Sequence, residues 1–218
     1  MSHILPVDTT VLAYFDTSLT PVFLLDDPVK GKLDDTTYVL SGDIATDITD
    51  VVTNVRVKRG RSRWLDSINA GTASFTVQNL TRDFDPLASG AYSTNIVPGK
   101  RITIQVGGTP IFDGTIEDWD LKYTIGGYAT ATAVASDALS DLGRQTLSAY
   151  TSTAQLSGAR VNAVLDRTEV NFPAGSRDID TGATSLQADI VGNGTNVLDY
   201  LKLVAETETG RLFVTVDG

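Results

Sequence analysis

The chain has 218 residues, a formal net charge of −10, a hydrophobic fraction of 41% and no cysteine. These values are typical of a globular protein with one domain or two small ones. The missing cysteines exclude disulfides and thiol chemistry, and the acidic balance argues against stable nucleic-acid binding, because phosphate contacts need a basic surface. No apolar run approaches the roughly 20 residues of a membrane helix, so no membrane partner is expected.

Charge is distributed unevenly along the chain. Residues 1–54 hold nine Asp and two Lys, whereas residues 55–63 hold five basic residues and no acidic one. We expect residues 1–44 to form an extended acidic segment, with short strands in its apolar runs, that lies along a neighbouring sheet or another subunit. The asymmetry has two open interpretations: a solvated acidic face beside a basic turn, or electrostatic matching between subunits. The apolar runs are Val11–Phe15, Val22–Leu25 and Tyr38–Leu40.

The stretch Val51–Leu87 organises the chain. Apolar residues alternate with basic ones at Val55–Lys58, and a second alternating run follows at Thr72–Val77, so both predict strands. A basic turn, Arg59–Arg63, lies between them. Pro86 closes the stretch because proline lacks the amide donor that a strand ladder needs.

Further strands follow, and we expect a tight hairpin turn at Gly107-Gly108 and another turn at Gly126-Gly127. The short strands and their turns predict a small barrel or sandwich over residues 45–145, and we expect a β-barrel domain there, followed by a short helix that Asp137 caps. The alternating runs are Arg101–Val106, Pro110–Thr115, Thr115–Tyr123 and Tyr128–Ala135.

Residues 146–218 predict an α+β segment that begins a further domain. Thr146–Gly158, rich in Ser, Thr and Ala, predicts a linker or surface excursion. Apolar spacing predicts helices over Ala159–Arg167 and from Thr195 to Glu208, and alternation predicts a strand over Arg211–Val216. The chain stops on a turn pair with no strand after it, so we expect a fragment of a longer polypeptide. The fold class is mainly β with an α+β C-terminal part.

Catalytic candidates are scarce. His3 is the single histidine and stands near the terminus, so histidine-dependent triads and the usual zinc sites lack their parts. Glu117 and Asp118 point to opposite faces of a strand, which favours solvated side chains over a catalytic pair. We expect no enzyme, no cofactor and no metal. A cell-wall hydrolase that uses Glu117, Asp118 or Asp120 is a rival hypothesis.

The basic turn supplies the candidate binding residues. It could contact nucleic acid, but no aromatic residues interleave with the arginines, so a hairpin turn that makes ion pairs is favoured. Trp64 and Trp119 are core anchors or, alternatively, interface anchors, since tryptophan is enriched at interfaces. The candidate subunit-interface residues are Arg56, Lys58, Arg59, Arg61, Arg63 and Trp64.

Several longer segments carry a family resemblance. They read LDDPVKGKLDDTTYVL at Leu25–Leu40, VRVKRGRSRWLDSINAGTASFTVQN at Val55–Asn79, RDFDPL at Arg82–Leu87, FDGTIEDWDLKY at Phe112–Tyr123, GARVNAVLDRT at Gly158–Thr168, RDIDTG at Arg177–Gly182 and NVLDYLKLVAETETGRLFV at Asn196–Val214. In this order they resemble minor tail proteins of the long, flexible-tailed phages of actinobacteria, of the central tail-hub family. The resemblance covers nearly the whole chain.

This resemblance implies a structural component of the virion tail tip, which closes the distal end of the tail tube and serves host attachment. It implies a β-barrel domain followed by α+β segments, assembled as a homo-oligomeric ring, commonly a trimer. The implied partners are the distal tail protein, the tape-measure protein and other minor tail or receptor-binding proteins. The alternative function is a carbohydrate- or receptor-binding module of the tail tip, which would present Trp119 and Tyr123 on an open groove.

Overall fold

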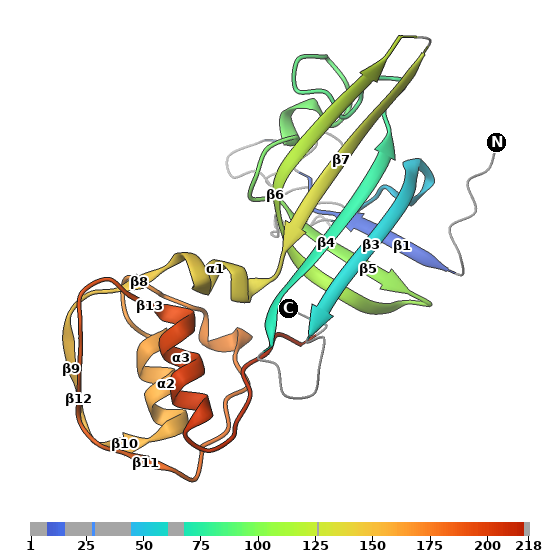
Figure 1. The fold of residues 1–218 in the computed structure, drawn as a ribbon. Helices are drawn as coiled ribbons and strands as arrows, with labels where there is room; N and C mark the ends of the chain where they lie inside the picture. Colours follow the sequence, from blue (N-terminus) through green and yellow to red (C-terminus); the bar gives the residue numbers. More distant parts are fainter. Residues whose placement is uncertain (1–7, 16–27, 29–44, 61–67, 126, 216–218) are drawn as a thin grey trace. The chain divides into compact units, whose positions relative to one another are not determined.

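The computed structural model describes residues 8–15, 28, 45–60, 68–125 and 127–215, and the chain divides into two compact units. The first unit comprises Met1–Val57 and Thr72–Ala135, and the second comprises Lys58–Gly71 and Ser136–Val216, within the described ranges. Figure 1 labels the helices and strands of both units. The strands expected at Val22–Leu25 and Tyr38–Leu40 lie outside the described residues.

The first unit is built around a large antiparallel sheet. Its strands are β1 (Thr9–Ala13), β2 (Thr46–Asp47), β3 (Val52–Gly60), β4 (Asn69–Gln78), β5 (Arg101–Val106), β6 (Thr109–Thr124) and β7 (Tyr128–Ser136). They lie in the order β2-β1-β5-β6-β7-β4-β3, so β2 and β3 are the two ends of the sheet over the described residues. The expected mainly β fold with a helical C-terminal part is confirmed, but over the described residues the sheet does not close into a barrel. Closure needs a strand long enough to bond both edges, but β2 is two residues long and a 3-10 turn, η1 (Thr49–Val51), separates it from β3.

The predicted hairpin at Gly107-Gly108 is confirmed. β5 pairs with β6 in antiparallel register, with Val106 opposite Thr109 and a register shift between Ile104 and Gln105. Both turn glycines have positive φ, 57° and 75°, which suits the tight turn that joins two twisted strands. The two alternating runs predicted after this turn form one continuous strand, β6.

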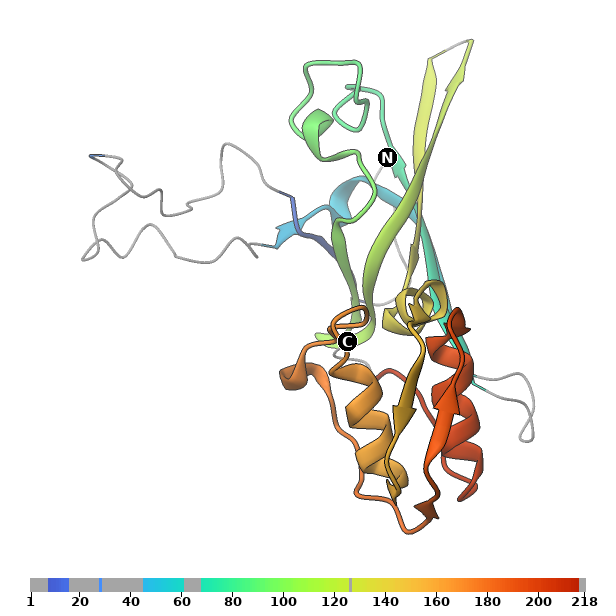
Figure 2. The ribbon, with the colours of Figure 1, turned by 90° about the vertical axis from the view of Figure 1, so that its left-hand side faces the viewer.

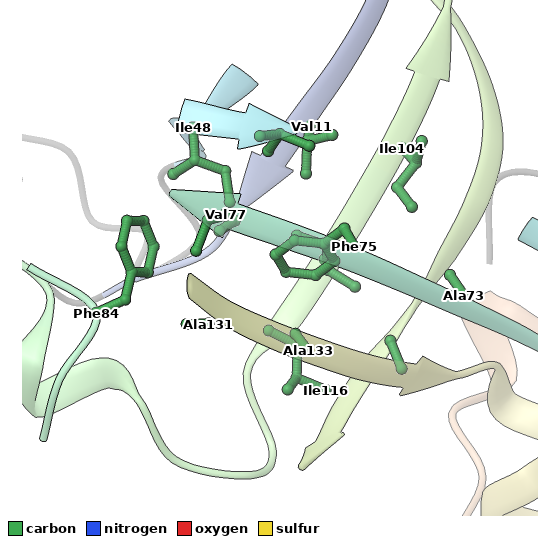
Figure 3. Packing of buried hydrophobic residues seen from close by; sticks show 14 of the residues in the cluster. Val11, Ile48, Ala73, Phe75, Val77, Phe84, Ile104, Ile116, Ala131 and Ala133 are labelled. Atoms are coloured by element: carbon green, nitrogen blue, oxygen red, sulfur yellow. The ribbon is translucent and has the colours of Figure 1, made fainter. Parts of the chain in front are cut away.

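The core of the first unit lies on one face of the sheet, where alternate residues are buried (Figure 3). On β4 these are Ala73, Phe75 and Val77, and on β7 they are three alanines, whose small side chains permit close packing, as the sequence indicates. A loop that contains a second 3-10 helix, η2 (Ser93–Asn95), follows β4 and adds Phe84 to this core. The fully buried residues of β7 are Ala131, Ala133 and Ala135.

The second unit packs three helices with short strand pairs. Its elements are α1 (Ala138–Arg144), β8 (Thr146–Leu147), β9 (Tyr150–Ser152), β10 (Gln155–Leu156), α2 (Ser157–Leu165), η3 (Ala174–Ser176), β11 (Ser185–Leu186), β12 (Asp189–Val191), β13 (Thr195–Asn196) and α3 (Val197–Glu206). The predicted cap of α1 is confirmed, because the Asp137 side chain accepts the Leu139 N–H. Helices α2 and α3 lie side by side (Figure 2), and Val164 and Leu201 from them are fully buried in the core of this unit.

Two expectations for this unit are wrong. Thr146–Gly158 is no linker, because it contains β8, β9, β10 and the start of α2, and its backbone pairs with β11–β13. Arg211–Thr215 forms no strand, although Leu212 and Val214 are half-buried as alternation predicts. Its carbonyls at Val214 and Thr215 instead accept hydrogen bonds from Arg59, at 2.9 and 2.7 Å, so a side chain replaces a partner strand.

A buried arginine connects the elements of the second unit. Arg160 on α2 is 2% exposed. Its guanidinium donates to Tyr200 Oη at 2.9 Å, Thr153 O at 2.8 Å and Gln187 O at 2.9 Å. Neutral oxygens thus surround the cation and compensate its desolvation.

No helix in the described part of the chain is long and apolar enough to cross a membrane.

Candidate functional site: a polar network beside an exposed hairpin

The loop after β4 is fixed to the sheet by backbone and ring contacts. The Asn79 N–H donates to Ala129 O at 2.8 Å, and Asn79 Oδ1 accepts the Phe84 N–H at 3.0 Å. The ring of Phe84 is buried, with its centroid 6.0 Å from that of Trp119 on β6. Between Asn79 and Phe84 the loop turns at Arg82, whose φ of 60° is unusual for a residue with a side chain.

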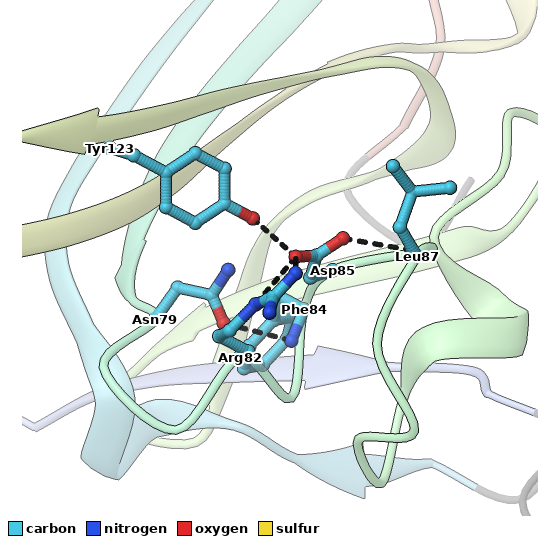
Figure 4. A network of polar contacts seen from close by, with 6 residues as sticks. All are labelled: Asn79, Arg82, Phe84, Asp85, Leu87 and Tyr123. Carbon is cyan, nitrogen blue, oxygen red and sulfur yellow. Dashed lines mark hydrogen bonds and ion pairs between the residues drawn. The ribbon is translucent and has the colours of Figure 1, made fainter.

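These contacts place Asp85 at the centre of a polar network (Figure 4). Its Oδ2 accepts hydrogen bonds from Tyr123 Oη at 2.6 Å and from Arg82 Nη2 and Nε at 2.6 and 2.9 Å. Its Oδ1 accepts the Leu87 N–H at 2.8 Å. The hydrogen bond from Tyr123, with those from Leu87 and Arg82, lowers the pKa of Asp85 to about 2. The same bond raises the pKa of Tyr123.

The chemistry of this network is structural. A carboxylate with a pKa of about 2 stays ionised near neutral pH, so it is a poor proton donor or acceptor there. Both oxygens of Asp85 already accept hydrogen bonds. The network therefore holds Tyr123 and Arg82 in fixed positions at the surface.

A hollow of about 460 Å³ opens beside the network, between the loop and the end of the β6–β7 hairpin. Tyr123 is 53% exposed and Tyr128 is 74% exposed. Ile125, at the hairpin turn, is fully exposed. Tyrosine and arginine are the residues that dominate protein-binding surfaces, so this region is suited to binding by contact. The hollow is lined by Leu80, Arg82, Tyr123, Thr124, Gly127, Tyr128 and Ala129.

The predicted interface residues are only partly described. Arg56 and Lys58 are exposed on β3, whereas Arg59 is half-buried and binds the carbonyls of Val214 and Thr215. The other three predicted residues, Arg61, Arg63 and Trp64, lie outside the described residues. A role of Arg56 and Lys58 at a subunit interface stays a prediction.

The carboxylates of β6 lie at different degrees of burial along the strand. Asp118 and Asp120 are exposed, Glu117 is half-buried, and Asp118 Oδ1 accepts the N–H of Trp119 at 2.8 Å. Within the described ranges, no group of three or more His, Asp or Glu residues could hold a metal ion. Trp119 packs against the core, with its ring 5.6 Å from Phe75.

Sequence reasoning missed the link between Asp85 and Tyr123, which are 38 residues apart. The segment RDFDPL was interpreted as the end of a strand. The signal for a turn in this segment is Asp85 followed by Pro-Leu. In such a turn the aspartate carboxylate accepts the N–H two residues later, as Asp85 does from Leu87.

No protein-family model and no curated protein sequence matches the chain. Among solved structures, it is similar to the 43 kDa tail protein of prophage MuSo2 from Shewanella oneidensis, with a TM-score of 0.56, 13% identity, and 93% of this chain and 50% of that chain covered. It is also similar to the tail protein from Neisseria meningitidis MC58, with a TM-score of 0.52, 8% identity, and 92% and 45% covered. The chain spans about half the length of each protein. It has the fold of these two tail proteins.

Proposed function

We propose that the chain is a structural component of the phage tail tip, the hub that closes the distal end of the tail tube. The observation that carries this proposal is the similarity in fold to two tail proteins, one of them from a prophage, over more than nine-tenths of the chain. The ordered resemblance to tail-hub segments of flexible-tailed actinobacterial phages agrees with it. In this proposal the hub connects the tube with the tape-measure protein and with receptor-binding proteins.

The proposed mode of action is assembly without catalysis. The hub is a homo-oligomer, a ring of three copies, located at the tip of the virion tail, where it also contacts the distal tail protein. The exposed tyrosines beside the Asp85 network support contact-based binding, because tyrosine supplies a large rigid surface at a low entropy cost.

Immunogold labelling of purified virions tests the location. Antibodies against the chain should label the end of the tail opposite the capsid, and mass photometry of the purified chain should show three copies. Label along the whole tail shaft, or no label on virions, would refute the hub assignment. Finding the chain in virion particles that have no tail attached would refute the hub assignment too.

A second candidate function is binding of a cell-surface carbohydrate. The observation in its favour is the open hollow with Tyr123 and Tyr128, whose volume of about 460 Å³ is within the usual range for small-ligand sites. Trp119, packed against the core, does not contribute to an open groove. Saturation-transfer NMR with soluble cell-wall oligosaccharides tests this candidate. Transfer that disappears in Tyr128→Ala supports it, and no transfer in the wild-type chain rejects it.

A further inference from the structure

The seven-stranded sheet carries opposite charges at two borders of its solvent face. On β3, the end strand, Arg56 and Lys58 are exposed while Val55 and Val57 turn toward the core; we call this pair the basic border. On β6, Asp118, Asp120 and Lys122 are exposed at alternate positions; we call the two aspartates the acidic border, and Lys122 lies between them and the hairpin end. Both pairs point away from the core because alternate strand residues point to opposite faces.

The distal half of β6 is a true border of the sheet. β5 pairs with β6 only as far as Thr115, so no described strand lies beside residues 117–124 on the side away from β7. From this border the sheet continues through β7 and β4 to β3. The face between the borders is uncharged: Thr76 on β4 and Thr132 on β7 share a hydrogen bond of 3.0 Å there.

The border charges have no ion-pair partner within the described part of the chain. Arg56, Lys58 and Asp120 make no side-chain hydrogen bond or ion pair, and Asp118 accepts only the N–H of its neighbour Trp119. Exposed charges of this kind guide association with a surface of opposite charge and set its orientation.

Apolar side chains accompany the acidic border. Beyond it, Ile125 is fully exposed and Tyr128 is 74% exposed at the end of the hairpin. A two-stranded ribbon that projects past its core is only marginally stable in water, and such apolar exposure is typical of a contact surface. At the basic border, Val55 and Val57 pack against the core on the opposite face, so the charged pair is the contact feature there.

We propose that the acidic border and hairpin end of one copy dock against the basic border of a second copy of this chain. The proposal rests on the proposed function, since a ring requires contact between copies. The two borders are different surfaces of one molecule, so the contact is heterologous, and repetition of a heterologous contact about an axis closes a ring. Charge complementarity fixes the direction in which the copies follow each other.

The contact is made by side chains and does not extend the sheet. Strand addition needs free backbone N–H groups along an edge, but the Trp119 N–H is already bonded to Asp118 Oδ1 at 2.8 Å. Charged residues of this kind on strand edges oppose edge-to-edge pairing. The hairpin end supplies the apolar anchor, and the charges form its rim.

The test is charge reversal with rescue, measured by sedimentation velocity of the purified chain at about 0.15 M and about 0.5 M salt. Arg56→Glu with Lys58→Glu should weaken self-association by at least about tenfold, since two exposed attractions become repulsions. Asp118→Lys with Asp120→Lys should weaken it similarly. The variant that combines all four substitutions should self-associate with an affinity within about threefold of wild type, because its borders are again of opposite charge.

Further variants keep the test sharp. Asp120→Lys alone leaves the Asp118 hydrogen bond intact and should still weaken self-association. Lys122→Glu adds a negative charge to the acidic border and should strengthen self-association, which a misfolded variant would not do. Ile125→Ser should weaken association, whereas Ile190→Ser, at a residue 81% exposed in the second unit, should not.

The outcomes separate this inference from the function on which it rests. Wild-type oligomers that persist in both reversed variants, or reversed variants that the combination does not rescue, overturn the proposed contact and leave the ring intact. A wild-type chain that stays monomeric up to about 100 µM overturns the contact and the ring together.

Discussion

Replacing Phe84 by alanine tests how the candidate site is built. The side chain of Phe84 is 1% exposed, and its ring centroid lies 6.5 Å from Phe15, 5.0 Å from Tyr92 and 6.0 Å from Trp119. Phe→Ala substitutions in cores cost about 3–5 kcal/mol. With three aromatic neighbours losing contact, we expect a loss near the middle of this range, about 4 kcal/mol.

Urea unfolding followed by tryptophan fluorescence measures the effect, because Trp119 contacts the deleted ring. With a slope of about 2 kcal/mol per molar urea, the midpoint of the first unit should fall by about 2 M. The deleted ring contacts lie within the first unit, so we expect the stability of the second unit to stay unchanged. Leu87→Ala, in the same loop but 91% exposed, is the control and should stay within about 0.5 kcal/mol. A loss below about 1 kcal/mol for Phe84→Ala would refute the docking of this loop in the core.

Three further substitutions test other parts of the fold. In Gly158→Ala the new Cβ would lie 1.9 Å from the Asp180 carbonyl oxygen, so calorimetry should show a melting temperature at least about 10 °C lower than that of wild type. Gly175→Ala, where the new Cβ meets open space, is the control, and equal melting temperatures for the two variants would contradict the close approach at Gly158. Arg160→Met should destabilise the second unit by about 2–4 kcal/mol in urea, because three oxygens lose their donor; a neutral result would mean that the desolvation of the cation outweighs its hydrogen bonds. Because the pKa of Asp85 is lowered to about 2, its charge stabilises the fold above about pH 4, and this contribution is lost as the pH falls through about 2; melting curves of Asp85→Asn should lie below wild type at pH 6 and converge at pH 2, and a constant difference would contradict this assignment.

Local patterns were read correctly where the chain makes its own contacts. Alternation gave Arg101–Val106 with its bounds, because the hairpin that follows it is closed by Gly107 and Gly108 at positive φ. Asp137 was recognised as a cap because the carboxylate and the amide that it accepts are two residues apart. The strand predicted over Arg211–Val216 failed for the opposite reason. Its alternation is real, but whether a strand forms depends on a partner, and here the partner is the side chain of Arg59.

The candidate site was not anticipated from the sequence. Charge spacing predicts Arg56 and Lys58 as interface residues instead; both are exposed, and their role at an interface stays a prediction. The Asp85 network was missed, because its members come from the loop after β4 and from β6. Only the packing of Phe84 against the sheet brings them together.

The sequence by itself determined the mainly β character, the helices of the C-terminal part, and the absence of cysteine chemistry. These depend on the spacing of apolar and turn residues, which acts over a few residues along the chain. The tertiary structure alone decided that the sheet stays open, that Thr146–Gly158 belongs to a packed unit, and that Tyr123 is anchored at the surface while Trp119 packs inward. Each of these depends on which segments meet across long sequence separations, and a pattern of neighbouring residues does not specify that.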